Sequence, residues 1–162
     1  MSDAVTAAWQ QLKGLTRPDL TELFADPARL DLLVKTGHRL QLAAEAGADG
    51  ITIHVEAQHD VAETLRRIRA ARCQAGLSLR PETDFSAVIP YLDQIDLLLV
   101  MTVVPGFGGQ PLIPATLETV RAAKLYREKH GLSYHIEVDG GITQETSIDA
   151  TAAGANVLVA IF

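Results

Sequence analysis

The sequence predicts an α/β fold, an incomplete (β/α)8 TIM barrel of about five parallel strands that follows an N-terminal helical segment. From residue 38 onward, β-branched stretches alternate with amphipathic ones, whereas residues 1–37 are helical in pattern, with "LDLLV" at 30–34 as the one strand candidate. Within 52–56 and 135–139, polar and aliphatic residues alternate. A doubly wound sheet is covered on both faces and reads as apolar throughout, so one polar face favours a barrel.

The expected elements alternate along the chain and are bounded by glycine and proline. Gly47 ends a first helix, Asp60 and Gly76 bound a second, and Gly131 ends a long one, while Pro90 must bend or break a short helix. The expected helices are 38–46, 60–76, 85–94, 114–130 and one within 143–155, and the expected strands are 50–57, 77–80, 95–104, 135–141 and 156–162. We therefore divide the chain into a helical segment, 1–37, and a partial barrel domain, 38–162.

The composition limits the classes of function. The chain has 162 residues, 48% of them apolar, which is enough for one domain with a core. The net charge of −6, with dispersed Lys and Arg, argues against a nucleic-acid partner. The single cysteine, Cys73, excludes an internal disulfide and fits a reducing compartment. With no leader pattern and no run of membrane-span length, we expect a cytoplasmic protein without a membrane partner.

The ends of two expected strands carry the chemistry. Asp139 closes the strand "HIEVD", in which His135 and Glu137 share its face because side chains alternate along a strand. The loop "PGFGGQ" and the turn "DGG" each follow a strand, where barrel sites lie. Their backbone N–H groups can surround an anion because glycines lack side chains. His54 is expected to line the lumen or to form a hydrogen bond within the core, not to bind a ligand.

Four segments together resemble the ribulose-phosphate 3-epimerase family over roughly residues 38–162. They are "ITIHVEA", "LVMTVVPGFGGQPLIP", "HIEVDGGI" and "GANVLVAIF", in this order and spacing. The resemblance implies a cytoplasmic isomerase of the pentose phosphate pathway that interconverts D-ribulose 5-phosphate and D-xylulose 5-phosphate. A divalent metal of the Zn, Fe, Mn or Co class would assist proton exchange at carbon 3.

The resemblance also implies roles for particular residues. Asp139 would be both a proton acid/base and a metal ligand. The residues implied to bind the sugar phosphate are Met101, Gly106, Phe107, Gly108, Gly109, Gly140 and Gly141.

The chain departs from the family pattern at both ends. The family's first three strands carry a Ser, a His-x-Asp and a His; none of these motifs occurs before residue 38, and His38 precedes a helix. Three of the family's four metal ligands are therefore not found in this sequence. The family's "VAGSAIF" reads "VAIF" here, Val104 replaces an Asn or Glu, and Glu82 replaces a Gly. Residues 4–36 resemble the N-terminal helices of glucose-6-phosphate isomerase.

These departures leave three readings of function open. The chain is an epimerase-family enzyme, truncated and impaired as an isolated chain; or it is a non-catalytic partial barrel that binds sugar phosphate weakly or acts by association with another chain; or it is a relative with a new base. Candidate bases for the third reading are Asp19, Glu22, Asp26 and Asp31. Strand edges at 51–56 and 157–162 predict a homo-oligomer or an aggregation-prone chain.

Overall fold

A computed structural model of the chain describes residue 44 and residues 47–160. The helical segment predicted at 1–37, with its four candidate bases, lies outside the described residues, as do most of the helix expected at 38–46 and the last two residues of the C-terminal strand. The chain divides into two compact units, Met1–Ala48 and Asp49–Phe162. The domain boundary after residue 37 stays a prediction.

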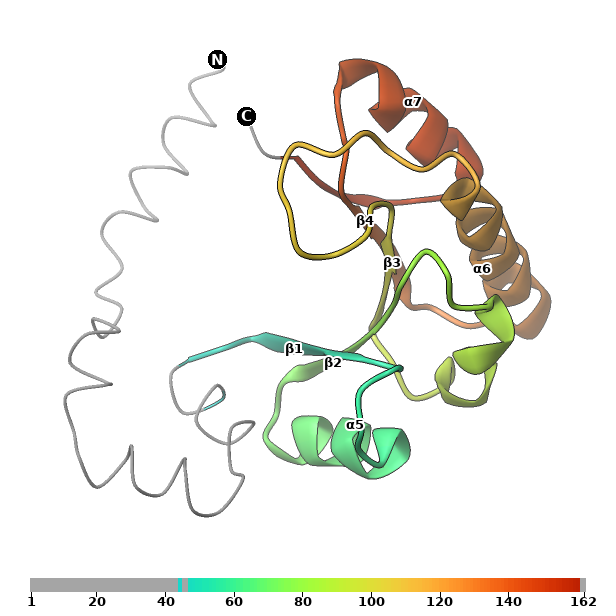
Figure 1. Cartoon of the computed structure of the whole chain (residues 1–162). Coiled ribbons are helices and arrows are strands. Elements are labelled where there is room, and N and C mark those ends of the chain that lie inside the picture. The colour runs from blue at the N-terminus through green and yellow to red at the C-terminus, as the bar shows by residue number, and fades with distance from the viewer. Residues whose placement is uncertain (1–43, 45–46, 161–162) are drawn as a thin grey trace, which may run out of the picture. The chain divides into compact units, whose positions relative to one another are not determined.

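The second unit is built on one parallel sheet of five strands (Figure 1). The strands are β1 (Gly50–His54), β2 (Gln74–Leu79), β3 (Leu97–Met101), β4 (His135–Asp139) and β5 (Val157–Val159). They lie in chain order, and every neighbouring pair is parallel. This confirms the predicted number, order and direction of the strands. Their carboxyl ends consequently meet at one edge of the sheet.

Helices connect the strands and pack on the sheet. They are α5 (Val61–Ala70), α6 (Thr116–His130), α7 (Gln144–Ala153) and the 3₁₀ helices η1 (Phe85–Ala87) and η2 (Ile89–Tyr91). In Figure 1, α5 lies against β2, and α6 lies against β3 and β4 beside α7. Pro90, which has no N–H, falls at the start of η2, so the helix expected at 85–94 is two short turns. Within the described part of the chain, no helix is both long and apolar enough to cross a bilayer.

The core lies between the helices and one face of the sheet. In β3, Leu98 and Val100 are almost fully buried, whereas Leu97 and Leu99 are partly exposed. The residues on the other face of the sheet are neighbours across the paired strands. We call this face the open face and define it by these residues: Thr52, His54, Ser78, Leu97, Leu99, Glu137 and Asp139. The alternation predicted from the sequence is confirmed along β4, where Ile136 and Val138 are buried under the helices and polar groups lie opposite, whereas β3 places Leu97 and Leu99 on the open face.

The prediction of one helix over residues 60–76 is wrong at its end. Helix α5 stops at Ala70, and Arg72 takes a left-handed conformation with φ of 63° before β2 begins at Gln74. Gly76 is a strand residue of β2 paired with Thr52, and a Cβ there would lie 2.2 Å from the Thr52 Oγ1 of β1. This glycine permits close approach of two strands and does not end a helix.

Candidate functional site

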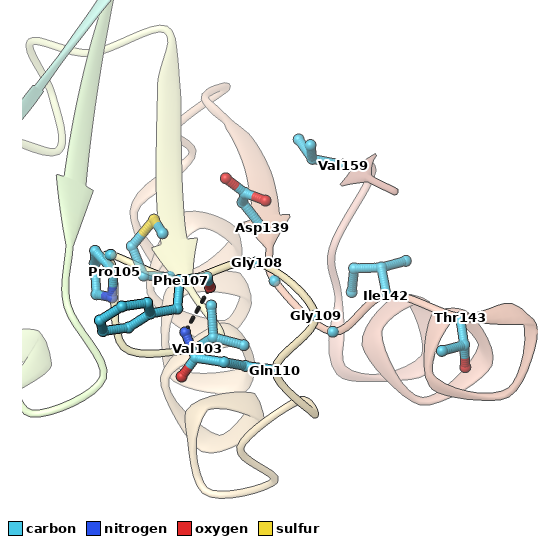
Figure 2. Close-up of a pocket in the computed structure, with 14 residues that line it drawn as sticks. Val103, Pro105, Phe107, Gly108, Gly109, Gln110, Asp139, Ile142, Thr143 and Val159 are labelled. Carbon is cyan, nitrogen blue, oxygen red and sulfur yellow. Dashed lines mark hydrogen bonds between the residues drawn. The ribbon is translucent and has the colours of Figure 1, made fainter. Parts of the chain in front are cut away.

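A cavity of about 490 Å³ lies at the carboxyl ends of β3 and β4 (Figure 2). All eight residues predicted for the site line it, namely Met101, Gly106, Phe107, Gly108, Gly109, Asp139, Gly140 and Gly141. Sequence reasoning did not identify six further lining residues, Val103, Pro105, Gln110, Ile142, Thr143 and Val159. One signal for Thr143 was available, since a threonine before a helical stretch is a common N-cap, and Thr143 does cap α7. The roles assigned to the eight residues stay predictions.

Asp139 is held at the end of β4 by the sheet itself. It pairs with Met101 of β3 and Val159 of β5, and its backbone carbonyl accepts a hydrogen bond from the Thr102 N–H at 2.9 Å. The buried Thr102 hydroxyl donates to the Gly140 carbonyl at 2.6 Å, which fixes the turn after Asp139. The Asp139 carboxylate is therefore presented to the cavity from a rigid strand end, as Figure 2 shows.

Gly140 and Gly141 allow the two cavity loops to approach closely. Their φ angles are 119° and 66°, in the region that favours glycine. A Cβ on Gly140 would lie 2.3 Å from Val103 Cγ2, and one on Gly141 would lie 2.1 Å from the Leu112 backbone nitrogen. The "DGG" turn consequently packs on the segments at both ends of the glycine loop.

The glycine loop, residues 104–110, forms the opposite wall of the cavity. Gly106 and Gly109 have φ angles of 133° and 74°, and the Phe107 side chain is 84% exposed. Added Cβ atoms at Gly106, Gly108 and Gly109 would meet nothing within 4 Å. The backbone of this loop is thus open to a ligand, as its composition predicted.

The carboxylates on β4 set the electrostatics of the cavity. Burial raises the pKa of Glu137 above its ordinary value, and the charge of Asp139 two residues away raises it further. Both side chains lie on the open face, so an anion at the carboxylates is disfavoured. A phosphate would be favoured nearer the backbone N–H groups of the two glycine loops.

A second polar cluster lies at the end of β1, apart from the residues that line the cavity. His54 Nδ1 is 3.1 Å from Glu56 Oε2, and Ser78 Oγ is 3.5 Å from His54 Nε2. Glu56 Oε1 accepts hydrogen bonds from the Arg80 N–H at 2.8 Å and the Thr83 hydroxyl at 2.5 Å. Burial acts to raise the pKa of Glu56, but these hydrogen bonds outweigh it and the pKa is lowered. His54 is thus a hydrogen-bonded histidine, but its side chain is 38% exposed and does not lie in the core.

The described residues do not form a complete metal site. Residues 47–160 contain no group of three or more His, Cys, Asp or Glu side chains placed to hold one ion. Asp139 offers one carboxylate, whereas a divalent cation takes several protein ligands or waters. We therefore derive no chemical step through a metal from these residues.

Comparison with known proteins relates the chain to one protein family. A profile of the Ribulose-phosphate 3 epimerase family matches residues 16–161, which extends the similarity N-terminally beyond the resemblance noted at residue 38. The ribulose-phosphate 3-epimerase of Escherichia coli K12 is 39% identical over 135 residues, covering 83% of this chain and 60% of that protein. The enzyme of the same name from Mycobacterium tuberculosis H37Rv is 43% identical over 117 residues, covering 72% and 51%.

Solved structures agree on the fold. A mutant tryptophan synthase alpha-subunit from the hyperthermophile Pyrococcus furiosus superposes with a TM-score of 0.58 at 20% identity, covering 80% of this chain and 51% of that one. This likeness, with the five sequential parallel strands, shows part of a TIM barrel.

The chain spans about half to three fifths of the length of the two curated epimerases it matches. Because the family profile matches nearly the whole length of the chain, residues 16–161, the chain belongs to the ribulose-phosphate 3-epimerase family.

Proposed function

We propose that the described residues supply the carboxyl-terminal part of a ribulose-phosphate 3-epimerase site, with D-ribulose 5-phosphate and D-xylulose 5-phosphate as substrates. One observation carries the proposal: a single cavity joins the Asp139 carboxylate to both glycine loops. In this proposal Asp139 exchanges the proton at carbon 3 from one face of the sugar. A carboxylate on a rigid strand end suits a positioned general acid/base.

The same proposal assigns the phosphate to the two glycine loops. Backbone N–H groups bind phosphate without a particular side chain, and the Cβ positions of Gly106, Gly108 and Gly109 are open. The carboxylates of Asp139 and Glu137 disfavour an anion beside β4, which supports a phosphate position on the side of loop 104–110.

Epimerisation needs more than this part of the site. Inversion of one carbon without turning the substrate over requires an acid/base on each face, and the described residues offer Asp139 on one. A metal that stabilises the enediolate contributes several kcal/mol in such chemistry, and its further ligands would come from outside residues 47–160. We therefore expect the isolated chain to bind sugar phosphate but to show no measurable epimerisation.

A coupled epimerase assay on the purified chain with added divalent metal tests the proposal. Asp139→Asn is the site variant, and Asp149→Asn, an exposed position on α7, is the matched control. Turnover by the wild type and by Asp149→Asn that Asp139→Asn abolishes would show that the chain is catalytically complete and that our expectation is wrong. Turnover that persists in Asp139→Asn indicates a contaminating host enzyme.

The alternative is a non-catalytic partial barrel, favoured by the lack of a metal-binding cluster among the described residues. Turnover that appears when a second chain carrying a His-x-Asp strand is added would favour the enzyme. Sugar-phosphate binding that never becomes turnover would favour the binding protein. A cytoplasmic location and a homo-oligomeric state stay predictions.

A further inference from the structure

Few backbone hydrogen bonds hold the glycine loop in one shape. Within the described part of the chain, Pro105 and Gly106 form one hydrogen-bonded turn, and no further backbone–backbone hydrogen bond has a donor or an acceptor in residues 104–110. Two of its glycines, Gly106 and Gly109, have positive φ angles and great conformational freedom. Such a segment samples many conformations unless side chains restrict it.

The Gln110 side chain supplies this restriction. Its Nε2 donates to the Val104 carbonyl at 2.7 Å and to the Phe107 carbonyl at 2.7 Å. Figure 2 shows the second of these bonds, which runs from Gln110 back to the middle of the loop. Both N–H groups of one amide are thereby used to join the start, the middle and the end of the loop.

We propose that Gln110 is a positioning residue for the site: its amide holds loop 104–110 in the conformation that lines the cavity and binds phosphate. The phosphate part of this inference rests on the proposed function. The two bonds also engage carbonyl oxygens that would otherwise repel a bound anion. Gln110 acts through the loop backbone and needs no contact with the substrate.

Gln110→Glu is the informative variant because it keeps the shape of the side chain, removes both donors and places a carboxylate against two carbonyls. Gln110→Ala removes the donors without adding a charge. Gln94→Glu makes the same chemical change at a glutamine outside the cavity, whose amide donates to the Pro90 carbonyl at 3.4 Å. All three are made in the full chain.

The first measurement is made without ligand. Amide ¹⁵N order parameters of Gly106, Gly108 and Gly109 should fall from about 0.8 to below about 0.6 in both Gln110 variants and stay unchanged in Gln94→Glu. Unchanged order parameters in Gln110→Glu would overturn the proposal. A loss of order at these glycines in Gln94→Glu would do the same, because the effect would not be local.

The second measurement is the affinity for inorganic phosphate and for D-ribulose 5-phosphate, by calorimetry. A weakening of roughly threefold to tenfold in Gln110→Ala, and a larger one in Gln110→Glu, is expected for the loss of about one net hydrogen bond. Lower loop order with unchanged affinity would overturn the positioning role. If no protein binds either probe while loop order falls in the Gln110 variants, the proposed function fails and the loop-holding role stands.

Discussion

Replacement of Gly141 by alanine should destabilise the chain through two separable effects. Gly141 has a φ of 66°, where an added Cβ is strained, and that Cβ would lie 2.1 Å from the Leu112 backbone nitrogen. The left-handed conformation alone costs about 1–2 kcal/mol for a residue with a Cβ. Overpacking in a site that cannot expand adds about 1–3 kcal/mol. The sum, about 2–5 kcal/mol, is a large fraction of the 5–15 kcal/mol typical of a domain.

Gly131→Ala separates the two effects. Gly131 follows α6 with a φ of 62°, nearly that of Gly141, but a Cβ there would meet nothing within 4 Å. This variant should therefore lose only the conformational share of the free energy of unfolding, about 1–2 kcal/mol. Gly108→Ala serves as a second control in the cavity itself, since Gly108 has neither a positive φ nor a close neighbour and its replacement should be nearly neutral.

Urea unfolding followed by circular dichroism gives the three free energies on one scale. The expected order of destabilisation is Gly141→Ala, then Gly131→Ala, then Gly108→Ala. Gly141→Ala should also lose phosphate affinity, because relief of the clash moves the "DGG" turn away from residues 111–112. A Gly141→Ala free energy of unfolding within error of that of Gly131→Ala would refute the steric argument and leave only the backbone one.

Three further predictions concern pH and association. The pKa of Glu56 is lowered in the folded chain. The ionised side chain therefore stabilises the fold above its ordinary pKa of 4.5, and this stabilisation is lost as the pH falls through the lowered pKa of the folded state. Glu56→Gln should therefore lower the free energy of unfolding in urea by about 1–3 kcal/mol at pH 7 and by less at pH 4. An equal loss at the two pH values would contradict a stabilising role for the ionised Glu56 side chain. Burial raises the pKa of Tyr134 to about 12 against the opposing charge of Arg127, so stability is intact below pH 10.0 and falls as the pH rises towards 12. Ultraviolet titration should show a late tyrosinate that Tyr134→Phe removes; titration of every tyrosine near pH 10.0 would count against it. Light scattering should give a mass that rises with concentration through the edge strand β5 and rises less in Val157→Lys, whereas a constant mass would argue against open edges.

Local patterns in the sequence determined much of the fold. The alternation along 135–139 assigned Ile136 and Val138 to the core, and both are fully buried. Gly131 was expected to end a helix and does so with a left-handed φ of 62°. Asp139 was expected at a strand end between glycine turns, and it lies there. Such features are set by periodicity and by single-residue conformational preference, which neighbouring residues reveal.

The tertiary structure alone decided which distant groups meet. Gly76 follows a helical pattern, yet it lies in β2 and packs closely against Thr52 of another strand. Glu56 is held by Arg80 and Thr83, 24 and 27 residues away. The bonds from Gln110 depend on a loop path that no periodicity encodes. Contacts between residues far apart in the chain form only when the sheet and its loops are assembled, so their partners cannot be inferred from local sequence preference.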